Sequence, residues 1–502
     1  MQLTIIEKIK KRFPGILYDL FFKKKSTGIS IVLHFNQSTT EYFNVAYEVC
    51  YGPVLKIIEK EQNIKFVLNF SKHFMLCMER FQKDKNILNT LKEKDNIIFA
   101  DSMLNQGIMG ILDKEVEEMM FPEKKSEYFW IPERCYDENI LETIKDHGYR
   151  STFSERECFD DEVVYRYDQL SVYPEHPFSR YVLDSFFMFG KNTFDMKRFL
   201  NSGNDFIYAE DAEVLGLWNY ERGMDHKCVH KRFKRFLKDI YLNENLISSF
   251  PHELNFSEEV QKKHTKPKKN HISSWISESF NGNINQFYEP DFDNFQEFLG
   301  SDRILRISRK TTELVKELNK LDLKTEIKKK LFDILYVYLF EFGCPGISSD
   351  EGYLWNGIYK LDMFLDLLRL EKNTLVRKRY QEREYFLIRL ADIFMIVDDN
   401  AQIKSYFDQE NDLAIMDELF HELNGKLKYD DNAIALRPHV RKTFDKIDIK
   451  TEENKIELLF RKDDVLTISI SVDMKGDIKI KKRQEYTVDN PCLLDRLYFD
   501  DI

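Results

Sequence analysis

Apolar residues in the first half of the chain fall into short runs that alternate with amphipathic stretches. The runs have the length and the β-branched or aromatic content of buried strands, and they cover residues 29–35, 66–70, 97–100, 128–131, 163–167 and 206–209. Between them, apolar residues recur at helical spacing over residues 46–61, 74–81, 115–120, 140–147 and 180–189. This alternation predicts an α/β fold in which a mainly parallel sheet closes as a barrel.

The pattern changes after the stretch at residues 262–270, which is basic, contains a proline and has no apolar periodicity. Leu, Ile and Val then recur at three- and four-residue spacing, which predicts the amphipathic helices of a bundle at residues 303–318, 325–342 and 359–370. Nearer the C-terminus, apolar and polar residues alternate, which predicts a domain of antiparallel strands that includes residues 455–460, 465–472 and 478–482.

These changes divide the chain into four expected segments. They are an N-terminal helical extension (1–28), a barrel (29–262), a helical domain (263–375) and a C-terminal β-sandwich-like domain (376–502). In the first segment, apolar residues at helical spacing predict an amphipathic helix packed on the body of the protein, with membrane-surface binding as the alternative. Charged residues break the apolar core that a secretory signal needs, and no run approaches the roughly 18 apolar residues of a membrane span.

The composition is that of a globular protein with an acidic balance. Of its 502 residues, 43% are hydrophobic, enough to bury at least one large core. The 86 acidic and 75 basic residues give a formal charge of −11, which argues against a general nucleic-acid binder because phosphate contacts need a basic field. An uncharged polar substrate fits better. The seven cysteines show no CxxC spacing, which predicts a reducing, cytoplasmic setting without a disulfide framework or a zinc site.

Two carboxylates stand in short and unusual contexts. Glu133 follows Trp130, Ile131 and Pro132, and Asp211 ends a run of mostly apolar residues that begins at Phe206. Each acid therefore comes just after a predicted buried strand, which is where α/β barrels place their chemistry. Two such acids on separate strands can converge on one bond.

Several segments resemble motifs of glycoside hydrolase family 57, particularly its α-amylase and 4-α-glucanotransferase members. Residues 33–37 (LHFNQ) resemble the HxHQP segment of the family, and residues 207–218 (IYAEDAEVLGLW) resemble its DDGEKFGxW region. Further similar segments are residues 129–136, Tyr173-Pro174 with Arg180-Tyr181, and residues 350–359 (DEGYLWNGIY). The resemblance spans residues 29–441 and depends on the colinear order of these short motifs.

This resemblance implies a distorted (β/α)7-type barrel, with the helical domain completing its cleft. It implies a retaining glycoside hydrolase or transglycosylase that acts on α-1,4-glucans, with Glu133 as nucleophile and Asp211 as acid/base. The residues that it implies for substrate binding are His34, Asn36, Gln37, Trp130, Arg134, Glu213, Trp218 and Trp355. No metal or organic cofactor is implied. The expected partner is an α-glucan or maltooligosaccharide, and the resemblance also allows a homodimer.

The neighbours of the two acids favour unequal roles for them. Arg134 adjoins Glu133, and His34 comes from the first strand, so a positive charge on either would favour an ionised nucleophile. Strand alternation sends Glu210 to the face opposite Asp211 but returns Glu213 to the same face. A negative charge there would raise the pKa of the acid/base.

Departures from the family pattern leave a second function open. Asn36 stands where the family has its second His, and Ser38 replaces its Pro; Ile98 and Asn105 stand in a stretch where family members carry Glu residues and a GFYEP run. A catalytically impaired member that binds glucan or another protein is therefore the alternative. A polysaccharide deacetylase on a related barrel would need a metal-binding Asp/His cluster, and no convincing spacing is present.

Two narrower alternatives also stay open. The histidine and the tryptophans of the expected site have an ordinary explanation as hydrogen-bonded or packed core residues; they are His34, Trp130, Trp218 and Trp355. Whether water or a sugar hydroxyl takes the glycosyl group depends on loop closure and acceptor contacts, with transfer slightly preferred.

Overall fold

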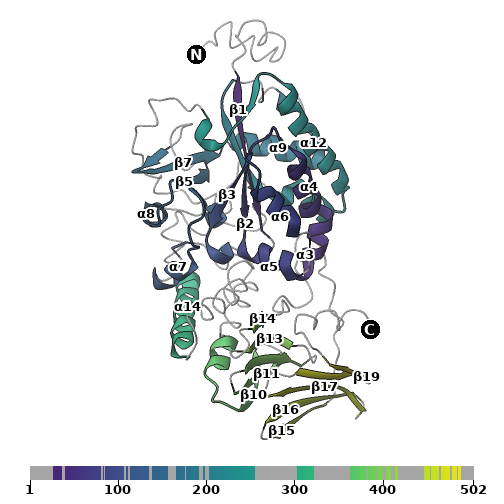
Figure 1. Ribbon diagram of the computed structural model, residues 1–502. Coiled ribbons are helices and arrows are strands. Elements are labelled where there is room, and N and C mark those ends of the chain that lie inside the picture. Colours follow the sequence, from purple (N-terminus) through teal and green to yellow (C-terminus); the bar gives the residue numbers. More distant parts are fainter. Residues whose placement is uncertain are drawn as a thin grey trace.

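The structure is a computed structural model of the chain, in which a large central sheet with its helices and two smaller sheets are the main parts (Figure 1). It describes residues 26–254, 302–321, 362–416 and 446–487, apart from short gaps at 37–39, 81–82, 84, 107–108, 111–113, 135–137, 156–164, 176, 192–195, 198–199, 201–202, 381–382, 392, 400–402, 409–412, 453, 463–464, 475–477 and 483. The expected N-terminal helix and the helix expected at 325–342 lie outside the described residues.

The central sheet has nine strands in the order β6-β7-β5-β4-β3-β2-β1-β8, and β9 pairs with the start of β1. Every ladder in it is parallel except that between β6 and β7. The strands are β1 (Thr27–Phe35), β2 (Phe66–Phe70), β3 (Ile97–Ser102), β4 (Tyr128–Trp130), β5 (Ser151–Glu155), β6 (Tyr165–Tyr167), β7 (Leu170–Glu175), β8 (Phe206–Asp211) and β9 (Leu246–Ser248).

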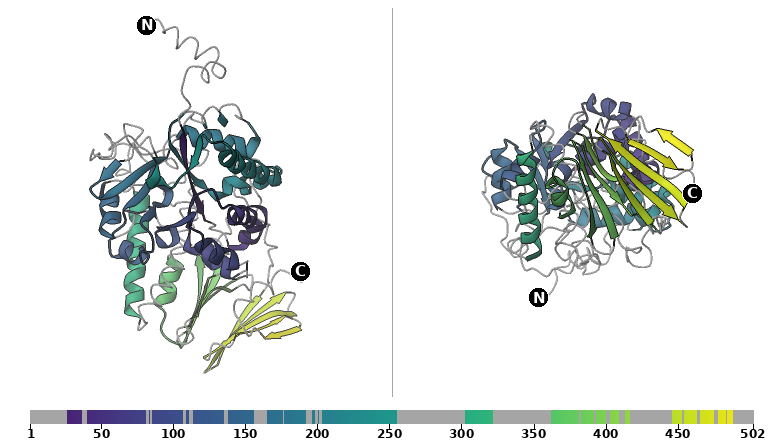
Figure 2. Two further views of the ribbon diagram at one scale, coloured as in Figure 1. Left: turned by 45° about the horizontal axis from the view of Figure 1, so that its top comes forward. Right: turned by 90° about the horizontal axis from the view of Figure 1, so that it is seen from below.

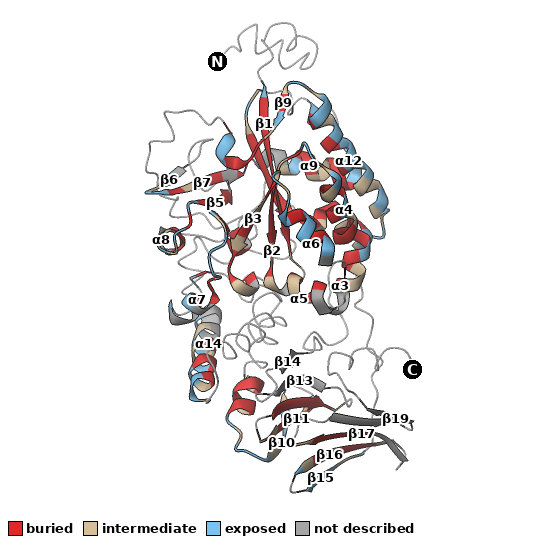
Figure 3. Cartoon of the chain, in the orientation of Figure 1, coloured by how far each residue is buried: buried red, intermediate tan, exposed pale blue. Residues whose placement is uncertain are grey.

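Strand β1 lies at the centre of the fold and is buried along its whole length (Figure 3). Its alternate residues enter two different clusters, as expected for a strand covered on both faces. One set packs against the helices in an outer core and consists of Ile29, Ile31, Leu33 and Phe35. Val32, on the other face, joins an inner core. The inner core collects side chains from seven described strands, namely Val32, Val67, Ala100, Tyr128, Trp130, Phe153, Tyr173, Ile207 and Ala209.

The inner core shows that the central sheet is strongly curved. Tyr173 of β7 and Ala209 of β8 share this cluster, although β7 and β8 are separated by five strands in the hydrogen-bonding order. No ladder between described residues joins β8 to β6 or β7. The α/β fold with a mainly parallel sheet is confirmed, whereas hydrogen-bonded closure of the barrel stays a prediction.

Helices cover the outer face of the sheet (Figure 1). They are α3 (Thr40–Ala46), the π-helix η1 (Tyr47–Tyr51), α4 (Gly52–Lys60), α5 (Lys72–Arg80), α6 (Lys85–Lys92), α7 (Lys114–Met120), α8 (Glu138–Asp146), α9 (Pro177–Phe189), α11 (Leu217–Glu221) and α12 (His226–Leu242). The 3-10 helices are η2 (Leu104–Gln106), η3 (Pro132–Arg134), η5 (Ala212–Leu215) and η6 (Pro251–Glu253). The amphipathic pattern of α12 explains its packing, because its buried Phe233 and Phe236 meet the ring of Phe187 on α9 edge to face.

The C-terminal part contains two five-stranded antiparallel sheets (Figure 2). They comprise β10 (Thr374–Tyr380), β11 (Arg383–Leu390), β12 (Ile393–Asp398), β13 (Ile403–Asp408) and β14 (Leu413–Met416), and β15 (Lys446–Glu452), β16 (Lys455–Lys462), β17 (Val465–Asp473), β18 (Ile478–Lys482) and β19 (Gln484–Thr487). Their apolar faces share one core in which Phe386 and Phe460 meet edge to face, so the two sheets form a sandwich.

Within the range expected for the helical domain, the described residues include α14 (Asp302–Lys320) and a helical segment at residues 362–368. The two are joined by ion pairs, including one between Lys310 and Asp362. No described helix is long and apolar enough to cross a membrane.

Candidate active site

The carboxyl ends of β2, β1 and β8 form one row at a single edge of the central sheet. His34 of β1 pairs in register with Asn69 of β2 on one side and with Asp211 of β8 on the other. Because Ile207 and Ala209 both enter the inner core, strand alternation directs Asp211 to the same inner face. The structure thus places Asp211 and His34 side by side at the strand ends.

His34 is held in one orientation by Asn69. Its Nδ1 lies 2.7 Å from the Asn69 side-chain oxygen, and the Asn69 amide nitrogen donates to the carbonyl oxygen of Ala100 at 2.7 Å. Since the amide nitrogen is committed to a carbonyl, the Asn69 oxygen must accept, and His34 Nδ1 must carry the proton. The Nε2 atom of His34 is then an acceptor.

Burial determines the charge of His34. Its side chain is almost fully buried, and desolvation is the main reason why its pKa is lowered to about 3. The nearby positive charge of Arg134 also lowers the pKa, whereas the Asn69 hydrogen bond raises it. His34 is therefore neutral at physiological pH. The expectation that His34 supplies positive charge to the site is wrong, and this role falls to Arg134.

Trp130 ends β4 and forms a wall of the site. Its ring stacks on His34 with centroids 4.9 Å apart and an interplanar angle of 14°, and the Arg134 guanidinium carbon lies 4.9 Å from its centroid. Trp130 is only 2% exposed, so these two contacts, rather than open ring surface, account for its position. A tryptophan in this place supports the neighbouring polar groups.

Arg134 ties the end of β4 to two other strands. It closes η3 with a φ of 52°, a left-handed conformation that non-glycine residues rarely adopt. Its buried guanidinium pairs with Glu175 at the end of β7 and donates to the carbonyl oxygen of Ala209 in β8 at 2.6 Å. The residue after Glu133 is thereby bonded to the residue two positions before Asp211. The side chain of Glu133 lies outside the described residues.

A buried network of ion pairs continues from Arg134 to β8. Arg180 of α9 lies 3.8 Å from Glu175 and 3.4 Å from Glu210, and both glutamate side chains are 3% exposed. The Glu210 carboxylate also accepts the backbone N–H of Asp211 at 3.0 Å. Two arginines and two glutamates balance in charge, which offsets the cost of burying them. The predicted placement of Glu210 on the face opposite Asp211 agrees with its ion pair to Arg180 of α9.

Glu213 lies one turn beyond Asp211 and meets Tyr51 of the π-helix. The Tyr51 hydroxyl contacts the Glu213 carboxyl and lies 2.7 Å from the backbone carbonyl oxygen of Asn36. A phenol has one proton, so the Tyr51 hydroxyl can donate to only one of these two acceptors at a time. Desolvation raises the pKa of Glu213 well above its ordinary value, and the charge of Asp211 raises it further, against a smaller opposing effect of the Tyr51 hydrogen bond. Burial and the charge of Asp211 therefore favour the neutral form of Glu213.

Close backbone packing brings these segments together. Gly216 follows η5 with a φ of 156°, and a side-chain carbon there would lie 2.9 Å from the carbonyl oxygen of Val49 in the π-helix. Only glycine allows this approach. The π-helix η1 ends at Tyr51, whose hydroxyl contacts Glu213.

A sequence comparison finds a family similarity in the N-terminal part of the chain. Residues 2–188, somewhat more than a third of the chain, match the family model described as Glycosyl hydrolase family 57. This part of the chain is similar to that family. The matched range contains His34 and Glu133 and ends before Asp211. No curated protein sequence matches the chain.

Solved structures similar to the chain include 4-alpha-glucanotransferase from Thermococcus litoralis, with 12% identity, coverage of 92% of this chain and 86% of that chain, and a TM-score of 0.48. The alpha-amylase AmyC from Thermotoga maritima has 12% identity, coverage of 68% and 92%, and a TM-score of 0.43. The GH57-type branching enzyme from Pyrococcus horikoshii has 13% identity, coverage of 68% and 88%, and a TM-score of 0.42.

The remaining residues expected in the family 57 site are spread over different environments. Asn36 is partly buried at the end of β1, and Trp218 packs against the outer core as a partly buried residue. Gln37 and Trp355 lie outside the described residues. Among the residues that the structure describes, no three His, Cys, Asp or Glu side chains lie close enough to hold a metal ion.

Four residues that shape the candidate site were not expected from sequence: Tyr51, Asn69, Glu175 and Arg180. Asn69 carries a usable signal, since a polar residue interrupts the apolar strand FVLNF. Arg180 lies in a segment that resembles a family motif, but no role was predicted for it.

Proposed function

We propose that the protein is a retaining glycoside hydrolase or transglycosylase that acts on α-1,4-linked glucans. The observation that carries the proposal is the link from Arg134 to Ala209, because it ties the segment of Glu133 to the strand of Asp211. The similarity of residues 2–188 to glycosyl hydrolase family 57 supports the proposal.

In the proposed mechanism, Glu133 attacks the anomeric carbon while Asp211 protonates the leaving oxygen. Asp211 then removes a proton from water or from a sugar hydroxyl, which attacks the covalent glycosyl intermediate. Arg134, next to Glu133, is the positive group that favours an ionised nucleophile. This assignment requires the two carboxyl groups to lie about 5 to 5.5 Å apart across the sugar.

We infer that Glu213 acts in its neutral form, which burial favours. As a neutral acid, it does not add a second negative charge when Asp211 gives up its proton to the leaving group. Two ionised carboxylates side by side at a partly buried strand end would oppose that step. We infer that a protonated Glu213 lets Asp211 cycle between its acid and base forms.

His34 is suited to bind a sugar hydroxyl. Its Nδ1–H is committed to Asn69, so Nε2 is left as a neutral acceptor at the inner face of the strand ends. Because the imidazole is uncharged, its Nε2 atom can accept a hydrogen bond from a sugar hydroxyl. Asn36, at the end of the same strand, is a second group for substrate hydroxyls.

The products formed from maltotriose test this function. We expect oligosaccharides longer than maltotriose, which is the signature of transfer; glucose and maltose alone would assign hydrolysis instead. Glu133→Gln and Asp211→Asn should each lower kcat at least about a hundredfold, because each removes a group that acts on the reacting atoms. Unchanged maltotriose with a folded wild-type protein, together with retained maltotriose binding, would support the glucan-binding alternative.

A reducing compartment is part of the proposal. Cys50, Cys77 and Cys228 are free thiols, and the first two are buried in the outer core. We therefore place the protein in the cytoplasm.

A further inference from the structure

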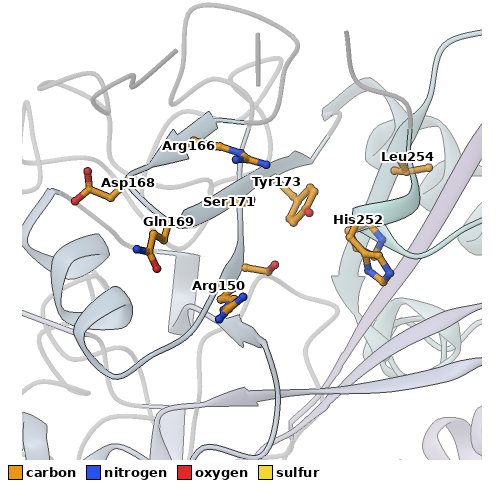
Figure 4. Close-up of a pocket in the computed structure, with 10 residues that line it drawn as sticks. Arg150, Arg166, Asp168, Gln169, Ser171, Tyr173, His252 and Leu254 are labelled. Atoms are coloured by element: carbon orange, nitrogen blue, oxygen red, sulfur yellow. The ribbon is translucent and has the colours of Figure 1, made fainter. Parts of the chain in front are cut away.

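A pocket of about 560 Å³ lies at the edge of the central sheet where the parallel strands begin. Its walls are the starts of β5 and β7, the turn between β6 and β7, and η6 (Figure 4). Asp211 ends β8 and Glu133 follows β4, so both belong to the opposite edge of the sheet. The pocket is therefore separate from the candidate active site. Its volume suits a small molecule and not a macromolecule.

Two arginines give the pocket a positive lining. Among the described residues, Arg166 makes no ion pair and no side-chain hydrogen bond. Arg150 lies 3.4 Å from Glu127, but its side chain is 73% exposed, and Glu127 is shared with Lys124 at 3.0 Å. Exposed ion pairs of this kind contribute little to stability, so either partner can readily pair with another charged group. Both guanidinium groups are thus available to a ligand.

Two rings of the lining, those of His252 and Tyr173, carry polar groups that are hydrogen-bonded within the protein. The Tyr128 hydroxyl lies 2.5 Å from Nδ1 of His252, and burial raises the pKa of Tyr128, so the phenol keeps its proton. When Tyr128 donates to Nδ1, the Nε2 atom of His252 carries the other proton and is a donor. Tyr173 also keeps its hydroxyl proton, because burial raises its pKa.

The single acid in the lining does not reverse this balance. Asp168 lies 3.1 Å from the ammonium group of Lys145, which also pairs with Glu142 at 2.5 Å. Two arginines against one aspartate leave the lining with an excess of positive charge, in a chain whose formal charge is −11. A local positive site on an acidic protein favours an anionic ligand.

We propose that this pocket binds a small phosphate monoester, with the phosphate group between Arg150 and Arg166. Guanidinium groups match phosphate oxygens with paired hydrogen bonds, which distinguishes this site from one built for a neutral sugar. The organic part of the ligand packs on the ring of Tyr173 and on Leu254, which line the same pocket. Gln169 offers an amide to its hydroxyl groups.

Isothermal titration calorimetry of the full chain tests this proposal with glucose 6-phosphate, inorganic phosphate and glucose as probes. We expect glucose 6-phosphate and inorganic phosphate to bind and glucose not to bind. Arg150→Gln and Arg166→Gln should each weaken the binding of glucose 6-phosphate about tenfold or more, since each removes a charge-assisted hydrogen bond. Arg235→Gln, at an exposed arginine of α12, is the matched control and should leave binding unchanged.

The outcomes separate this site from the active site. Saturating maltotriose should not displace glucose 6-phosphate, and Glu133→Gln should bind it as wild type does. Binding of glucose as tight as that of glucose 6-phosphate would overturn the proposal, as would no binding of either phosphate. Equal losses in Arg235→Gln and in the two pocket variants, all with native circular dichroism, would overturn it as well.

Discussion

The guanidinium of Arg134 donates a 2.6 Å hydrogen bond to the carbonyl oxygen of Ala209, which joins the segment after β4 to strand β8. The two residues flank the proposed catalytic pair, because Arg134 follows Glu133 and Ala209 stands two residues before Asp211. Arg134 also holds a left-handed backbone conformation, which a non-glycine residue keeps only when its surroundings enforce it. The relative position of the two proposed acids therefore depends on a buried arginine.

Removal of this arginine should be costly. In Arg134→Gln, Glu175 keeps only the more distant Arg180 at 3.8 Å as a described positive partner. We expect the free energy of unfolding to fall by about 3–5 kcal/mol, as for other buried pairs that lose one partner. Urea denaturation measures this, with Arg235→Gln at an exposed site as the control, expected to change stability by less than about 1 kcal/mol. Equal changes in both variants would contradict the buried network.

His34 should make stability depend on pH below neutrality. Its pKa is lowered from 6.5 to about 3 in the folded protein, so the unfolded chain binds a proton first as the pH falls. The stability it contributes is present above pH 6.5 and is lost between pH 6.5 and 3, at up to about 1.4 kcal/mol per pH unit. His34→Gln lacks this loss. The difference in unfolding free energy between wild type and variant should therefore shrink from pH 7 to pH 5, and a constant difference would show that His34 is not buried as a neutral group.

Glu213 should give the opposite dependence. Its folded-state pKa is raised above 4.5, so the stability that it contributes is present below pH 4.5 and is lost as the pH rises toward the folded pKa. Glu213→Gln keeps a neutral side chain of the same shape and removes this dependence. Relative to wild type, the variant should gain stability from pH 4.5 to pH 7 in chemical denaturation. A relative loss over that range would mean that Glu213 is ionised in the folded protein.

The central part of the fold could be predicted from sequence because its strands are continuous apolar runs. Strand β1 is buried on both faces, and such strands are recognisable by composition alone. Strands β5 and β7 were missed, since Ser151–Glu155 is rich in Ser and Thr and Leu170–Glu175 contains a proline. The strands β10 to β14 were not predicted individually, although a C-terminal β-sandwich-like domain was expected.

The site was predictable only in part. Asp211 could be placed at a strand end because the apolar run before it is local, and the structure puts it in register with His34. The partners that set charge could not be found this way. Asn69 lies 35 residues from His34, and Tyr51 lies 162 residues from Glu213, so no local pattern links either pair. The neutral state of His34 likewise follows from burial that only the folded chain reveals.

The most direct test of the central claim is covalent trapping with a maltosyl fluoride donor in Asp211→Asn, followed by mass spectrometry of the protein and its peptides. Fluoride leaves without protonation, so the variant should still form the glycosyl intermediate but release it slowly. We predict an added mass of one maltosyl group on the peptide that contains Glu133, and none in Asp211→Asn combined with Glu133→Gln. An adduct on another residue, or no adduct in a folded protein, would contradict the account.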